Sequence, residues 1–242
     1  MPIVYLPTDR TESVPRFAIV GNYPDQAASR FVKHVALLQS DEQLRFGAAD
    51  VRVWHMGPPL VVGERSSAAA GGGSTCIAHL IGAVDLDRFD IEGIVTWLAD
   101  VEKENRPSGI RGFIQQYTID PPVCWHTAED GTRLYRRFNC VGFVLDCYRS
   151  IDINLVDDTS KDNLPEVSLE TIESAYGRSV TTETIRGRMG ISGEGPWRIV
   201  LAGYVFHSLS RANSEIRDSP HIPKSDGERD FPIAQIPSDK SA

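Results

Sequence analysis

The segment RFNCVGFVLDCY, residues 137–148, is the most informative stretch of this chain. Its apolar residues have the spacing of one face of an α-helix, and they are Val141, Val144, Leu145 and Tyr148. The predicted helix begins at Cys140, where unpaired backbone N–H groups and the helix dipole stabilise negative charge. A thiol in that place is expected to have a lowered pKa and to supply a thiolate at neutral pH. The alternative is that Cys140 packs as a small apolar side chain, which is our interpretation of Cys147 two turns later.

A nucleophilic thiolate needs a base within hydrogen-bond reach and a third group that orients the base. The chain has six histidines, and two of them lie in segments that predict neighbouring strands. His34 lies within FVKHVALL (residues 31–38), and His55 directly follows VRVW (residues 51–54). Histidines on neighbouring strands can approach each other across a sheet. The alternative is that the two are unrelated strand residues, exposed or bonded to the backbone.

The segments KHVALLQ (33–39), VWHMGPP (53–59) and FNCVGFV (138–144), in this order, resemble the lecithin:retinol acyltransferase-like proteins. These proteins are a circularly permuted branch of the NlpC-type, papain-like cysteine superfamily. The resemblance implies that Cys140 is the nucleophile, that His34 is the general base and that His55 orients His34. It also implies an oxyanion or supporting role for Asn139, the residue before the nucleophile.

The activity that this resemblance implies is that of a cysteine hydrolase or acyltransferase, which includes amidases and thiol proteases. His34 would take the thiol proton, and Cys140 would attack a carbonyl to form a thioester acyl-enzyme. The backbone N–H of Cys140 is a candidate oxyanion donor. Gly142 stands where several acyltransferases have His, and the chain has no apolar C-terminal anchor. Both features weaken a lipid substrate more than they weaken a cysteine hydrolase.

Three alternatives remain open at this point. The same hydrolase could use His207, in LAGYVFHSL (residues 201–209), as its base, because the histidine follows the cysteine in the unpermuted superfamily. The same fold could be a non-catalytic binding module, because fold does not fix function. A zinc-stabilised interaction domain would use two Cys–His pairs as ligands, and these pairs are Cys76, His79, Cys124 and His126. The pairs are far apart with irregular spacing, so we expect neither a metal nor a cofactor.

The fold class that we predict is α+β, with a small antiparallel sheet packed on the helix that begins at Cys140. Strands are expected at residues 17–20, 31–38, 51–54 and 77–84, and helices at 91–104, 140–148 and 168–175. Asp90 is the expected N-cap of the first helix. Residues 1–15 are expected to form a loose arm, 16–210 a single permuted papain-like domain, and 211–242 a disordered polar tail. The low-complexity residues 63–75 are expected to be flexible.

The composition excludes several classes of function. The 242 residues are 41% hydrophobic and 24% charged, with a net charge of −8, which argues against nucleic acid as a partner. No apolar run reaches the roughly 18 residues of a membrane span, and the N-terminus lacks the pattern of a secretory signal peptide. Four cysteines are too few for a disulfide framework, so we expect a cytoplasmic protein. The expected substrate is a small molecule, a peptide or an acyl lipid, and the oligomeric state stays open.

Overall fold

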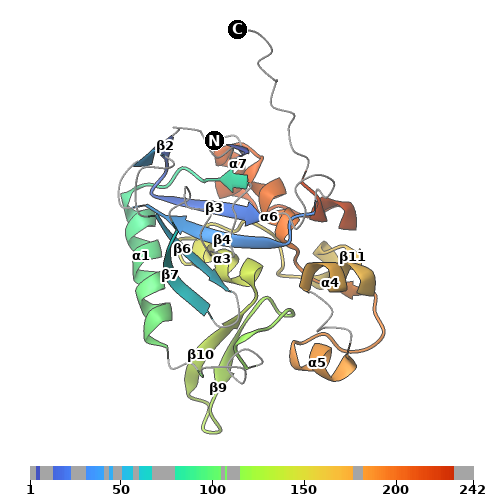
Figure 1. Ribbon diagram of the computed structural model, residues 1–242. Coiled ribbons are helices and arrows are strands. Elements are labelled where there is room, and N and C mark those ends of the chain that lie inside the picture. The colour runs from blue at the N-terminus through green and yellow to red at the C-terminus, as the bar shows by residue number, and fades with distance from the viewer. Residues whose placement is uncertain are drawn as a thin grey trace.

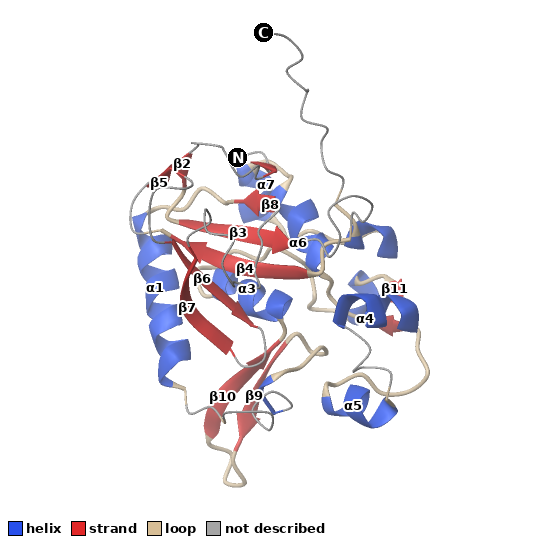
Figure 2. Ribbon diagram, in the orientation of Figure 1, coloured by secondary structure: helices blue, strands red, loops and turns tan. Residues whose placement is uncertain are grey.

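The computed structural model describes residues 4–5, 13–22, 31–40, 44–45, 51–56, 60–66, 80–104, 107, 115–176 and 182–231. Within these ranges the protein is a mixed α+β structure with small antiparallel sheets and several helices (Figures 1 and 2). The predicted α+β class is therefore confirmed at this level.

The main sheet has six strands, and every neighbouring pair is antiparallel. Its strands, in spatial order, are β1 (Val4–Tyr5), β8 (Leu80–Gly82), β3 (Phe17–Asn22), β4 (His34–Gln39), β6 (Val51–Met56) and β7 (Leu60–Ser66). Strands β3, β4, β6 and β8 confirm four predicted strands, although residues 77–79 lie outside the described residues. Strand β7 includes residues 63–66 of the low-complexity stretch, and residues 67–75 lie outside the described residues.

The remaining elements surround this sheet. The helices are α1 (Arg88–Lys103), α3 (Cys140–Arg149), α4 (Leu169–Tyr176), α5 (Glu183–Arg188), α6 (Ala202–Leu209) and α7 (Asn213–Asp218). Two 3-10 turns are η1 (Lys161–Asn163) and η3 (Asp226–Arg229). Three further strand pairs are β9 (Val123–Thr127) with β10 (Arg133–Phe138), β11 (Glu166–Val167) with β12 (Trp197–Arg198), and β2 (Ser13–Val14) with β5 (Leu44–Arg45).

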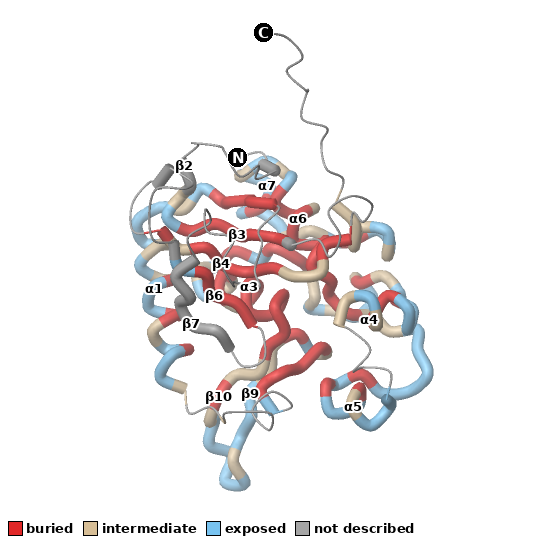
Figure 3. The backbone as a smooth tube through the Cα atoms, in the orientation of Figure 1, coloured by how far each residue is buried: buried red, intermediate tan, exposed pale blue. Residues whose placement is uncertain are grey.

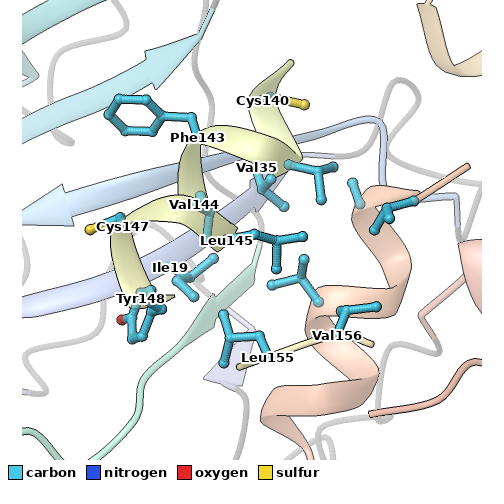
Figure 4. Close-up of a cluster of buried hydrophobic side chains, with 14 of the residues drawn as sticks. Ile19, Val35, Cys140, Phe143, Val144, Leu145, Cys147, Tyr148, Leu155 and Val156 are labelled. Carbon is cyan, nitrogen blue, oxygen red and sulfur yellow. The ribbon is translucent and has the colours of Figure 1, made fainter. Parts of the chain in front are cut away.

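Helix α3 is buried on most sides, as the tube in Figure 3 shows, because it packs against β4, β6, α1 and α6. Ile19 and Val35 from the sheet meet Val144 and Leu145 from the helix in one apolar cluster (Figure 4). The apolar face predicted for residues 140–148 is thus the face of a central helix. The sheet and this helix together hold Cys140 and the two histidines in one folded unit.

Helix α1 begins earlier than the sequence predicted. Its N-cap is Asp87, whose carboxylate accepts the Asp90 N–H at 2.9 Å, while the Asp90 carboxylate accepts the Asp87 N–H at 3.0 Å. This reciprocal capping box satisfies two otherwise unpaired N–H groups at once. The prediction of Asp90 as the N-cap is wrong, because Asp90 is the third helical residue of the same box.

Both predicted chain ends are more ordered than expected. Residues 4–5 and 13–14 form strand pairs with β8 and β5, so the predicted loose arm is joined to the rest of the chain at these points. Residues 211–231 contain α7 and η3 and form bridges to Val156 and Phe31. The prediction of a disordered tail is therefore wrong as far as Phe231, and residues 232–242 lie outside the described residues.

Candidate active site

His34 and His55 lie side by side on neighbouring strands. His34 is the first residue of β4 and His55 is the last but one of β6. The two strands run antiparallel, so the start of one lies beside the end of the other. Nε2 of His34 is 3.2 Å from Nδ1 of His55, and the two rings meet edge to face at 88°. The sequence-based expectation that these histidines approach each other across the sheet is confirmed.

Cys140 is the first residue of α3, and its thiol lies at the same end of β4 as His34. Figure 4 shows Cys140 at the start of α3, beside Val35 of β4. The backbone N–H groups of Val35, the residue after His34, and of Val141 and Cys140 act on the thiol in the direction that lowers its pKa. Only 3% of Cys140 is exposed. The structure therefore brings the predicted nucleophile to the strand that begins with the predicted base.

The pKa of Cys140 moves in the direction opposite to the sequence-based expectation. Burial raises the pKa of the thiol to about 11, although the surrounding N–H groups act to lower the pKa. The rule for helix N-termini holds in sign, but loss of hydration of a thiolate is the larger effect here. The predicted low thiol pKa is wrong in the resting structure, and Cys140 is a protonated thiol at neutral pH.

His34 is neutral at the same pH. Burial, followed by the repulsion of a positive charge by His55, lowers the pKa of His34 to about 4. A neutral imidazole can accept a proton, which an imidazolium cannot. The candidate site therefore rests as a neutral thiol and a neutral imidazole.

Asn139 holds the start of α3 in place. Its Oδ1 accepts the Gly142 N–H at 2.6 Å, and its Nδ2 donates to the Ile119 carbonyl at 3.3 Å. The side chain is fully buried. Because both ends of the amide are engaged, Asn139 acts on the site through the position of the helix, and its side chain does not face a substrate oxygen.

Gly142 has no room for a side chain. A Cβ atom at this position would lie 1.8 Å from the carbonyl oxygen of Pro122. The close approach of the α3 backbone to the segment before β9 therefore requires glycine. A histidine, or any other side chain, at position 142 cannot fit in this structure.

His207, the alternative base, lies on helix α6 and faces the C-terminal segment. Its Nε2 is 2.8 Å from the Asp230 carbonyl oxygen. Its ring stacks on His221 and meets Phe231 edge to face. The unpermuted arrangement would place the base on a strand, whereas His207 lies on a helix and its ring contacts the C-terminal segment.

The structure describes Cys147 and two of the four predicted zinc ligands, Cys124 and His126. Cys147 is fully buried in α3, as its packing role predicted. Cys124 and His126 lie on β9, and Cys76 and His79 lie outside the described residues. In the part of the chain that the structure describes, no three His, Cys, Asp or Glu side chains are grouped as metal ligands.

Two tyrosines near Cys140 were not found from the sequence. The ring centroids of Tyr117 and Tyr176 are 6.4 Å apart. Burial raises the pKa of each tyrosine, and the nearby Cys140 raises it further by charge repulsion. Tyr117 lies in residues 110–119, whose periodicity does not decide between a strand and a short helix. Tyr176 ends α4, so only the tertiary structure brings it to the thiol.

The comparisons with known proteins add no relative. No family model, no curated protein and no solved structure matches this chain. Separately, none of the helices in the described ranges has the length and apolar character that crossing a membrane requires.

Proposed function

We propose that this protein is a cysteine hydrolase or acyltransferase in which Cys140 attacks, His34 is the general base and His55 orients His34. The observation that carries the proposal is the 3.2 Å contact between His34 Nε2 and His55 Nδ1, at the end of β4 where the Cys140 thiol also lies. A thiol, an imidazole and a group that orients the imidazole are the parts that thiol-based acyl transfer requires.

The contact between the histidines determines which nitrogen can act as the base. Because Nε2 of His34 contacts His55, Nδ1 is the nitrogen that accepts the thiol proton. This role requires His34 to carry its own proton on Nε2 and to donate it to Nδ1 of His55. His55 then carries its proton on Nε2. In this proposal, the hydrogen bond to His55 holds the base in the required tautomer and orientation.

The reaction proceeds in two halves from the neutral resting pair. In the first, the thiol proton moves to His34 while the sulfur bonds the substrate carbonyl carbon, and the carbonyl oxygen becomes negative. The bond to the leaving amine, alcohol or thiol then breaks, the leaving group takes the proton from His34, and a thioester remains. In the second, His34 takes a proton from water, which attacks the thioester and releases a carboxylic acid and the Cys140 thiol. An amine or alcohol acceptor in place of water gives acyl transfer.

The start of α3 offers hydrogen-bond donors for the negative oxygen. The first N–H groups of a helix have no carbonyl partner within the helix. The N–H groups of Cys140 and Val141 lie beside the sulfur. They can donate to the oxygen of the tetrahedral intermediate, an interaction that strengthens as charge develops.

A circularly permuted NlpC-type, papain-like arrangement is the family assignment that we propose. Its support is the chain order, since β4 and β6 with their histidines precede α3 and both pack against it. We propose an amide, ester or thioester substrate, on a small molecule, a peptide or an acyl lipid.

A non-catalytic binding module is a second candidate function, and the burial of Cys140 favours it. A thiol that is 3% exposed, with a pKa raised to about 11, also suits a packing residue. The two functions differ in whether an acyl group is ever transferred to the sulfur.

The test is to mix the protein with thioester, aryl ester and peptide amide acyl donors and to follow both product release and intact protein mass. We expect an acyl adduct that maps to Cys140 and is lost in Cys140→Ala. His34→Gln should slow turnover by about 10²- to 10⁴-fold, the usual range for a general base. Cys124→Ala, on the partly exposed β9, is the matched control and should keep both signals.

Two outcomes would contradict the proposal. Turnover that persists in Cys140→Ala would remove Cys140 from the chemistry. A wild-type protein that forms no adduct and releases no product with any donor would leave the binding module.

A further inference from the structure

The segment of residues 226–231, here called the C-terminal strap, lies across the start of β4. The strap consists of η3 and the two residues that follow it. Asp230 forms an antiparallel bridge with Phe31, and the Val32 N–H donates to the Arg229 carbonyl at 3.2 Å. The strap thus contacts the two residues that lie just before Lys33 and His34. The strap therefore provides backbone pairing for the residues that precede β4.

Helix α6 fastens the strap from the other side. A backbone carbonyl only accepts hydrogen bonds, so His207 Nε2 donates its proton to the Asp230 oxygen at 2.8 Å. The Phe231 ring meets the His207 ring with centroids 5.2 Å apart. A Cβ atom on Gly203 would lie 2.2 Å from the Arg229 oxygen, so the strap rests directly on the helix backbone.

The side chain of Arg229 connects the strap to α4. Its Nη1 donates to the Asp226 carboxylate at 2.8 Å and also to the Thr171 hydroxyl. Its guanidinium lies over the Phe31 ring at 5.9 Å. Helix α4 ends at Tyr176, one of the two tyrosines near Cys140. One short segment therefore joins the start of β4 to two helices, one of which reaches the candidate site.

We propose that the C-terminal strap positions the candidate base, and that His207 is the positioning residue that holds the strap on α6. Residues at the end of a strand fray when nothing beyond them is bonded. His34 is the first residue of β4, so the bonds to Phe31 and Val32 stop fraying at the residue that must meet His55. That the strap positions the His34 ring does not depend on the proposed function. That the strap affects turnover rests on the proposed function.

The direct test measures the titration of His34 by NMR of the imidazole C–H signals, assigned with a His34→Gln variant. The wild-type signal should titrate near pH 4, the pKa that burial and His55 impose. In His207→Ala the strap loses its donor and water reaches His34, so the pKa should rise by about 1 unit or more toward the ordinary value of about 6.5. His207→Gln keeps an N–H for the Asp230 carbonyl and should restore the low pKa.

A pair of glycine substitutions provides an independent perturbation with a matched control. Gly203→Ala pushes the strap off α6 and should raise the His34 pKa in the same way. Gly187→Ala lies in α5 with no atom within 4 Å of the added carbon, so it should leave the titration unchanged. Arg229→Ala, which removes a partly exposed side chain, replaces either variant if that variant fails to fold.

The proposal is overturned if the His34 pKa stays at its wild-type value in folded His207→Ala and Gly203→Ala proteins. It is also overturned if His207→Gln behaves like His207→Ala, because the donated bond would then not be the cause. The His34 titration does not require turnover, so it tests the strap even if Cys140 forms no acyl adduct. Once a substrate is found, His207→Ala should lower kcat about tenfold with KM little changed.

Discussion

Replacement of Asn139 by alanine is the most direct test of how the candidate nucleophile is held. The substitution removes the acceptor for the Gly142 N–H and the donor to the Ile119 carbonyl. Loss of an N-cap costs about 1 kcal/mol. A buried carbonyl left without its partner costs about 1–3 kcal/mol more. We therefore expect the free energy of unfolding to fall by about 2–4 kcal/mol.

Urea unfolding, followed by tryptophan fluorescence and circular dichroism, measures this change. In thermal unfolding of a chain of this length, the melting temperature should fall by about 10 °C, at about 2–4 °C per kcal/mol. Asn154→Ala is the control, because Asn154 is exposed, and it should change stability by less than about 0.5 kcal/mol. An Asn139→Ala protein as stable as the control would refute the capping argument.

Asn139→Asp separates the two bonds that the asparagine makes. The aspartate keeps an acceptor for Gly142 but turns a second oxygen toward the Ile119 carbonyl. At neutral pH this buried carboxylate should destabilise the protein. Once the carboxyl is protonated it can donate to Ile119, so its stability deficit relative to the wild type should narrow in acid. A deficit that is the same at pH 7 and pH 4 would show that the Ile119 bond contributes little.

Three further predictions concern the helix start and the two titrating groups. Gly142→Ala should destabilise by about 3 kcal/mol or more, because the new carbon meets the Pro122 backbone and not a movable side chain; a wild-type melting temperature would contradict this. Iodoacetamide should modify Cys140 more slowly than Cys124, at a rate that still rises above pH 9 because the pKa is about 11, and a plateau below pH 8 would contradict this. Between pH 6.5 and pH 4 the unfolded chain binds a proton on His34 that the folded chain does not, so the free energy of unfolding should decrease as the pH is lowered. His34→Gln should flatten this pH dependence. Wild-type and His34→Gln stability curves that stay parallel would contradict the lowered pKa of His34.

The features that the sequence predicted correctly are those with a local signal. The apolar spacing around Cys140 is a property of ten neighbouring residues, and α3 follows it. The contact between His34 and His55 follows from two strand-like segments that are close enough in the chain to pair. The capping of α1 was misplaced by one turn because Asp87 and Asp90 are both good caps, and only the reciprocal bonds decide between them.

The features that the sequence missed depend on segments far apart in the chain. The pKa of Cys140 was predicted from the helix start alone, but the tertiary structure buries the thiol, and this burial raises its pKa. The order of residues 211–231 was missed because their polar, proline-containing composition is that of a disordered tail. Contacts with distant parts of the chain hold them, among them the Val156–His221 bridge, the Arg217–Asp90 ion pair and the bond from His207 to the Asp230 carbonyl.

The bridge between Phe31 and Asp230 joins residues separated by most of the chain. During synthesis, β4 emerges from the ribosome early, but the segment that pairs with its leading residues is made only near residue 230. Contacts between such distant positions also slow folding, because the intervening chain must be ordered before they form. We therefore expect a nascent or truncated chain to carry all three candidate residues and still lack an assembled site.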